Sequence, residues 1–162
     1  MNTSFQRSEN NKDEWLTPPS LLKGLGDFDL DPCSPIKRPY ETAKKYFTVL
    51  DNGLIQDWFG RVWCNPPYGN QTDLWLKKCK EHGNCVALVF ARTETKMFFN
   101  HVWENAHSIY FIKGRIKFLH ITRTRSGSAG ASSVLIAYGE NNKFSLESVR
   151  DYGYDGKLII LK

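Results

Sequence analysis

The hydrophobic positions of the chain fall into short apolar runs, separated by stretches in which apolar and polar residues recur at helical spacing. We predict strands at residues 27–33, 61–64, 85–90, 108–112, 133–138 and 157–161. We predict helices at residues 17–25, 41–46, 71–83 and 94–106. The run CVALVF at 85–90 is continuously apolar, which is typical of a parallel strand covered on both faces.

End signals support two of these helices, and an apolar stripe supports a third. Thr17 and Thr72 are expected to cap the first and third helices, and Gly83 is expected to end the third. The helix at 94–106 carries an apolar stripe on one side, which predicts packing against a sheet. The stripe consists of Phe98, Phe99, Val102, Trp103 and Ala106.

Strands that alternate with helices indicate an α/β fold, a compact single domain with a largely parallel central sheet. Ligands of such sheets bind beyond the carboxyl ends of the strands. Two predicted strands end in polar residues, at 29–33 and at 64–68, so both ends face one crevice if the strands are neighbours. We expect residues 1–12 to be a flexible tail and residues 13–162 to form the domain.

Length and composition agree with one globular domain. The chain has 162 residues, of which 41% are hydrophobic and 24% charged. No run of about 18 apolar residues is present, and the N-terminal stretch MNTSFQRSENNKDE lacks the apolar core of a signal peptide. We therefore expect no membrane span and a cytoplasmic location.

The four cysteines are Cys33, Cys64, Cys79 and Cys85, and no two of them form a C-x-x-C pair. Without a secretion signal, a disulfide framework is not expected. Cys79, His82 and Cys85 could suggest a metal ion, but the clustered spacing and the fourth ligand of a zinc site are missing. We expect buried thiols and no metal.

Positive charge is concentrated in the second half of the chain. Lys and Arg total 22 against 17 Asp and Glu, and the stretch 113–125 contains no acidic residue. It is followed by small, flexible residues up to 133. We predict phosphate contacts from this stretch, with salt-sensitive affinity, and the alternative is a solvated hairpin. The candidate DNA-binding residues are Lys113, Arg115, Lys117, Phe118, Arg123 and Arg125.

The sequence Asn65-Pro66-Pro67-Tyr68 follows the short apolar strand at 61–64. Proline fixes its own φ and biases the preceding residue toward an extended conformation. The four residues therefore predict a stiff turn that holds one amide and one aromatic ring close together at a strand end.

Four stretches in this order resemble the phage-type (Dam-like) DNA N6-adenine methyltransferase family over about residues 13–138. They are Trp15-x-Thr17-Pro18, Leu30-Asp31-Pro32-Cys33, Asn65-Pro66-Pro67-Tyr68-Gly69 and Gly114-Arg115-x-Lys117-Phe118. The resemblance implies a Rossmann-like, S-adenosylmethionine-dependent methyltransferase fold. It also implies methyl transfer to the N6 amine of an adenine flipped out of double-stranded DNA, in a phage or in a bacterium carrying a prophage.

The resemblance also implies roles for single residues. The Asn65 side-chain oxygen and the Pro66 carbonyl would accept the two amine hydrogens of adenine, and Pro67 would keep Tyr68 rigid for stacking on the base. Asp31 would accept from the amino group of the cofactor, and Asp51 would lie near its adenine, although Asp51 also fits a simple turn. The remaining candidate cofactor contacts are Trp15, Thr17, Pro18, Pro32 and Cys33.

One departure from the wider methyltransferase pattern follows Cys33. Residues 34–37 read Ser-Pro-Ile-Lys, where a Gly-x-Gly loop would let the cofactor approach the backbone. Two alternatives therefore stand beside DNA methylation: a methyltransferase of RNA or of protein amides, and an inactive DNA-binding module with the same fold. The sequence gives no indication of oligomeric state.

Overall fold

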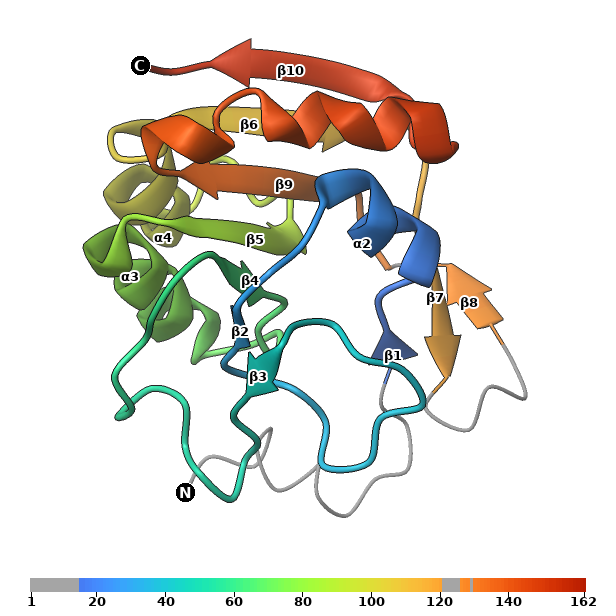
Figure 1. Cartoon of the computed structure of the whole chain (residues 1–162). Helices are drawn as coiled ribbons and strands as arrows, with labels where there is room; N and C mark the ends of the chain where they lie inside the picture. The colour runs from blue at the N-terminus through green and yellow to red at the C-terminus, as the bar shows by residue number, and fades with distance from the viewer. Residues whose placement is uncertain (1–14, 121–125, 129) are drawn as a thin grey trace.

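The computed structural model describes residues 15–120, 126–128 and 130–162 (Figure 1). Its strands are β1 (Trp15–Leu16), β2 (Leu30–Asp31), β3 (Lys45–Tyr46), β4 (Val62–Cys64), β5 (Cys85–Phe90), β6 (Ser108–Ile112), β7 (Lys117–His120), β8 (Ser126–Ser128), β9 (Ser133–Tyr138) and β10 (Gly156–Ile160). Its α-helices are α2 (Pro19–Leu25), α3 (Thr72–His82) and α4 (Lys96–Phe98). A π-helix η1 (Phe99–Trp103) and the 3₁₀ helices η2 (Glu140–Asn142) and η3 (Ser145–Tyr152) complete it.

A seven-stranded sheet of order β10-β6-β9-β5-β4-β2-β3 forms the centre of this compact α/β domain. The strands β3, β2, β4 and β5 pair in parallel, whereas β9 is antiparallel to both β5 and β6, and β10 is antiparallel to β6. The expected largely parallel sheet is therefore a mixed one. An apolar run such as 133–138 shows burial on both faces but carries no information on strand direction.

The two faces of the sheet bury two separate apolar clusters. Alternate residues of β5 point to opposite sides: Val86 and Leu88 belong to one cluster, and Ala87 and Val89 to the other. Figure 1 shows α2 and the helix before β10 over one face, and α3 with α4 over the other. Leu22 of α2 lies in the first cluster, whereas Leu76 of α3 and Phe98 of α4 lie in the second, so the helices on each side pack their apolar residues against the face that they cover.

A second, three-stranded sheet of order β1-β7-β8 lies beside the first and was not predicted. Strand β1 pairs antiparallel with β7, with Leu16 opposite Leu119, and β7 pairs antiparallel with β8. This small sheet ties the segment before α2 to the basic stretch after β6. Strands of two to four residues are too short to show a period in the sequence.

Several predicted boundaries were shifted or wrong. Thr17 does not cap α2, because Pro18 holds the N-cap position; Gln71 likewise holds that position in α3. The helix expected at 41–46 is absent, and the described residues there include the short edge strand β3 instead. Gly83 ends α3 with a φ of 76°, as predicted.

The segment predicted as a helix at 94–106 is shorter and less regular. Thr95 caps α4 by accepting a hydrogen bond from the backbone N–H of Phe98, and the chain then continues as η1. Phe98, Val102 and Ala106 are buried as expected, but Phe99 is 53% exposed. Successive side chains of a π-helix are rotated by less than the 100° of an α-helix. A stripe assigned at α-helical spacing therefore included Phe99, which is exposed.

Candidate functional site

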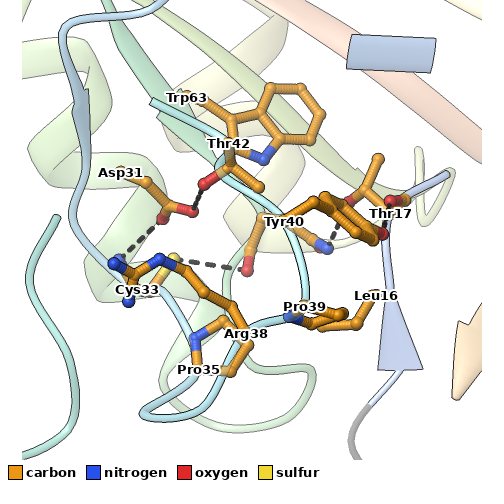
Figure 2. Close-up of a pocket in the computed structure, with 11 residues that line it drawn as sticks. Leu16, Thr17, Asp31, Cys33, Pro35, Arg38, Pro39, Tyr40, Thr42 and Trp63 are labelled. Carbon is orange, nitrogen blue, oxygen red and sulfur yellow. Dashed lines mark hydrogen bonds between the residues drawn. The ribbon is translucent and has the colours of Figure 1, made fainter. Parts of the chain in front are cut away.

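Strands β2 and β4 are neighbours, so the two polar strand ends singled out in the sequence meet. Leu30 of β2 pairs in parallel with Val62 of β4, which brings Asp31 and Asn65 to the same edge of the sheet. Both residues line one open pocket of about 450 Å³, a volume that includes open solvent (Figure 2). The pocket residues are Leu16, Thr17, Asp31, Cys33, Pro35, Arg38, Pro39, Tyr40, Thr42, Trp63 and Asn65.

Contacts to three different segments fix the turn that contains Asn65. The Asn65 side-chain N–H₂ donates to the Thr17 hydroxyl at 2.9 Å, and its backbone carbonyl accepts from the Cys33 thiol at 3.3 Å. The Thr72 hydroxyl at the start of α3 donates to the Pro67 carbonyl at 2.8 Å. The turn is therefore held from the strand side and from the helix side.

Two oxygens of the turn take part in none of these contacts. Among residues 15–120, 126–128 and 130–162, no group donates to Oδ1 of Asn65 or to the Pro66 carbonyl. The Thr17 contact engages the amide nitrogen of Asn65, so Oδ1 is the atom left to accept from a ligand.

Tyr68 stacks on an aromatic ring that the sequence analysis did not assign to the site. Its ring lies 4.1 Å from the ring of Phe90, centroid to centroid, at an interplanar angle of 9°. Phe90 is the last residue of β5, the strand next to β4. Tyr68 is 37% exposed as a whole residue, and desolvation raises the pKa of its phenol, which therefore stays protonated.

Asp31 is a buried carboxyl group without an ion-pair partner at bonding distance among the described residues. Burial raises the pKa of Asp31 from its ordinary value of 3.8 to about 6, although the Thr42 hydroxyl, the Cys33 N–H and the charge of Arg38 oppose the shift. The Cys33 N–H donates to one carboxyl oxygen at 3.1 Å and the Thr42 hydroxyl donates to the other. A carboxylate in this position gains from an added cation.

Arg38 is a cationic side chain that lines the pocket, and the sequence analysis did not assign it a role. Its Nε lies 3.2 Å from a carboxylate oxygen of Glu41, and its guanidinium carbon lies 3.0 Å from the centre of the Tyr46 ring. The Arg38 side chain is 12% exposed. Its neighbour Lys37, which has the same charge, is exposed and does not line the pocket.

The other predicted cofactor residues fall into two groups. Thr17 and Cys33 line the pocket, and the buried Pro18 and Pro32 lie beside them in the chain. Trp15 begins β1, next to the pocket residue Leu16.

Asp51 does not line the pocket. Its carboxylate accepts from the backbone N–H of Thr48 at 2.8 Å and from the Thr48 hydroxyl, as in a simple turn. The structure therefore shows the turn that the sequence allowed at this position.

The basic stretch alternates in burial. Lys113, Arg115 and Lys117 are exposed, whereas Ile116 and Phe118 are buried in the core. Phe118 is 7% exposed, so its ring is not presented to a partner in this structure. The predicted contacts Arg123 and Arg125 lie outside the described residues.

The four cysteines lie within one apolar region. The Cys85 thiol donates to the sulfur of Cys79 at 3.0 Å, and burial raises the pKa of Cys64, Cys79 and Cys85, so these thiols stay protonated. His82 binds the Gly60 carbonyl at 2.8 Å. Within the described part of the chain, no three metal-ligating side chains are grouped so as to hold an ion.

Comparison with protein families matches residues 4–154 to the family described as DNA N-6-adenine-methyltransferase (Dam). The chain belongs to this family, whose general activity is methylation of adenine N6 in DNA. Searches of the curated proteins and of the solved structures find no match. No helix in the described ranges is long and apolar enough to cross a membrane.

Proposed function

We propose that this protein transfers a methyl group from S-adenosylmethionine to the exocyclic N6 of an adenine that is flipped out of double-stranded DNA. The observation that carries the proposal is the placement of Asn65: it lines a pocket that also contains the buried carboxyl of Asp31, and no group in the described ranges donates to its Oδ1. Such DNA lies in the cytoplasm of a bacterium or of a phage-infected cell.

The order of the parallel strands supports a Rossmann-like arrangement. From β2 the chain passes to β3 on one side and returns to β4 on the other side of β2. Ligands of open α/β sheets bind at such a reversal, outside the carboxyl ends of the strands. The pocket beside Asp31 and Asn65 occupies this position.

The chemistry requires acceptors at the amine. The lone pair of adenine N6 is delocalised into the ring, which makes the amine a poor nucleophile. Acceptance of its two hydrogens by Asn65 Oδ1 and the Pro66 carbonyl favours tetrahedral nitrogen and localises the lone pair. The stabilisation grows as positive charge develops on nitrogen, so it acts mainly on the transition state.

Tyr68 and Phe90 would receive the base. Flipping an adenine out of a duplex costs a few kcal/mol, and stacking on one aromatic ring returns about 1–3 kcal/mol. Because the Phe90 ring already covers one face of Tyr68 at 4.1 Å, the base would stack on the other face of a ring held in place. Preorganisation of this kind reduces the entropy lost on binding.

The pocket residues fit the methionine end of S-adenosylmethionine, which supplies an electrophilic methyl group on a sulfonium when it is bound. Asp31 would accept from the α-amino group, because a buried carboxyl with a raised pKa gains from a cationic partner. Thr17, Pro18 and Cys33 would border the same end, with Trp15 and Pro32 beside them. The role predicted for Asp51 at the adenine end stays a prediction.

Lys113, Arg115 and Lys117 are the described candidates for phosphate contacts, since they are exposed along one strand-turn segment. Arg123 and Arg125 continue the same basic stretch in the sequence. Contacts of this type add affinity without reading bases, and they weaken as salt rises. We leave Phe118 out of the proposed contacts because it is buried.

The Asn65→Ala variant tests the proposal. It should abolish transfer of labelled methyl groups to unmethylated DNA while cofactor affinity, measured by calorimetry, stays nearly unchanged. Turnover within about tenfold of the wild type, roughly 1.4 kcal/mol, would contradict the acceptor mechanism.

Two further readouts separate the alternative activities. Label that enters only RNA or protein would reject DNA as the substrate. No binding of S-adenosylmethionine at millimolar concentration would support an inactive DNA-binding module. Digestion of DNA from expressing cells with methylation-sensitive nucleases, followed by modified-base sequencing, would report activity and specificity together.

A further inference from the structure

The loop after β2 offers no free backbone donor at residues 33–35. The Cys33 N–H donates to Asp31 at 3.1 Å, and the Ser34 N–H donates to the Phe47 carbonyl at 2.9 Å. Pro35, which lines the pocket, has no N–H. Backbone N–H groups of a glycine loop are a common way to bind an anionic group at this edge of a sheet, and here they are already bonded or missing.

Arg38 lies where a replacement donor is needed. Its guanidinium stacks on Tyr46, and Tyr46 is the residue of β3 that pairs with Asp31 of β2. Glu41 engages only Nε and Nη2 of Arg38, at 3.2 and 3.5 Å, out of five N–H donors on the group. The stacking and the ion pair hold the guanidinium in place at the pocket.

We propose that Arg38 binds the α-carboxylate of S-adenosylmethionine, in place of glycine backbone, while Asp31 binds the α-amino group. This inference rests on the proposed function and names the residue that anchors the far end of the cofactor.

The charges of the pocket match those of a free amino acid. Asp31 is 4% exposed, so water screens its charge weakly, and the Arg38 side chain lies at the border of the same pocket. An α-amino acid group carries one charge of each sign on a single carbon, and the pocket presents one partner of each sign. A planar guanidinium also matches a carboxylate with two parallel hydrogen bonds, which an ammonium cannot do.

Two ligands that differ only at this end provide the test. S-adenosylhomocysteine carries the amino acid group, and 5′-methylthioadenosine lacks it. We expect Arg38→Gln to weaken S-adenosylhomocysteine binding about 10- to 100-fold in calorimetry, the usual range for a lost charge-assisted hydrogen-bond pair. The affinity for 5′-methylthioadenosine should change less than about threefold.

Lys37→Gln is the matched control, because it removes the same charge at the adjacent, exposed position outside the pocket. It should leave both affinities unchanged. Arg38→Lys keeps the charge but loses the planar fork, so it should weaken S-adenosylhomocysteine binding by a smaller factor than Arg38→Gln. This variant also preserves the test if Arg38→Gln does not fold.

The outcomes are distinct. Equal losses for both ligands, or no loss for either, would overturn the role of Arg38 while the proposed methyltransferase activity could still stand. If Lys37→Gln had the same effect as Arg38→Gln, the affinity would depend on the positive charge of the region, and a direct contact from Arg38 would be overturned. A wild-type protein that binds neither ligand would refute the proposed cofactor itself.

Discussion

Replacing the buried Asp31 by asparagine should make the protein more stable and less able to bind its cofactor. Burial holds the pKa of Asp31 at about 6, above its ordinary value of 3.8. Ionised Asp31 therefore destabilises the folded state at neutral pH. Asparagine has nearly the same shape and carries no charge, so Asp31→Asn removes this cost.

The pKa difference sets the size of the effect. A shift of about 2.2 units, from 3.8 to about 6, corresponds to roughly 3 kcal/mol at pH 8. The asparagine amide has one oxygen and cannot accept from both the Cys33 N–H and the Thr42 hydroxyl as the carboxylate does. This lost hydrogen bond reduces the gain in stability by about 1 kcal/mol. A net gain of about 2 kcal/mol would raise Tm by about 4–8 °C in a chain of this size.

The pH dependence of the stability difference between the two proteins shows whether ionisation of Asp31 is its cause. Below about pH 3 the carboxyl is neutral in both folded and unfolded states, because both pKa values lie above that pH, so the two proteins should differ little. The advantage of Asp31→Asn should appear between pH 4 and 6 and be complete above about pH 7. Thermal unfolding of both proteins at pH 4.5 and pH 8, with Asp57→Asn as an exposed control, measures it.

Two results would refute the reasoning. One is a gain in Tm that is equal at pH 4.5 and pH 8, which would show that ionisation of Asp31 plays no part. The other is an Asp31→Asn protein less stable than the wild type at pH 8. Calorimetry on the same samples should show weaker S-adenosylmethionine binding, because asparagine has no charge to pair with the α-amino group. Such a loss of function with a gain in stability is a common trade-off.

Thr17→Val keeps the size of the side chain beside the cofactor but removes the 2.9 Å partner of the Asn65 amide, so it should lower kcat about tenfold and change KM for the cofactor by a smaller factor. Thr17→Ser should restore kcat. A serine variant as slow as the valine variant would contradict this positioning role. Phe90→Ala should raise KM for DNA about 2- to 10-fold in steady-state assays, because Tyr68 loses its stacked neighbour. An unchanged KM would show that the stacked pair plays no part in binding the base. Lys117→Gln should reduce the slope of log K against log salt by about 0.9 in DNA titrations, and an unaltered slope would exclude a phosphate contact.

The main elements of the site could be predicted because they follow from local signals. A short apolar run followed by Asn65 and two prolines marks a strand end, and Asp31 marks another. The assumption that the two strands are parallel neighbours was enough to bring both residues to one pocket, as the pairing of Leu30 with Val62 shows.

Other features depend on contacts between distant segments. Phe90 reads in the sequence as the last residue of a buried strand, and only the neighbouring turn brings it under Tyr68. Arg38 reads as one charge in a polar loop, and its position depends on Tyr46 in β3. Phe118 was predicted as a DNA contact together with the basic stretch, although its alternation with Lys117 in the sequence is compatible with burial of the ring.

The insertion of β9 between β5 and β6 makes the order of synthesis matter. Every pocket-lining residue in the described part of the chain precedes residue 66, yet β5 remains without a partner on one edge until residues 133–138 are synthesised. A nascent chain of 120 residues would contain these pocket residues, while the unpaired edge of β5 would still be exposed and prone to aggregation. Conversely, a separate fragment that contains β9 could complete the sheet by strand addition, so the protein is a natural candidate for splitting into two halves that regain activity only on association.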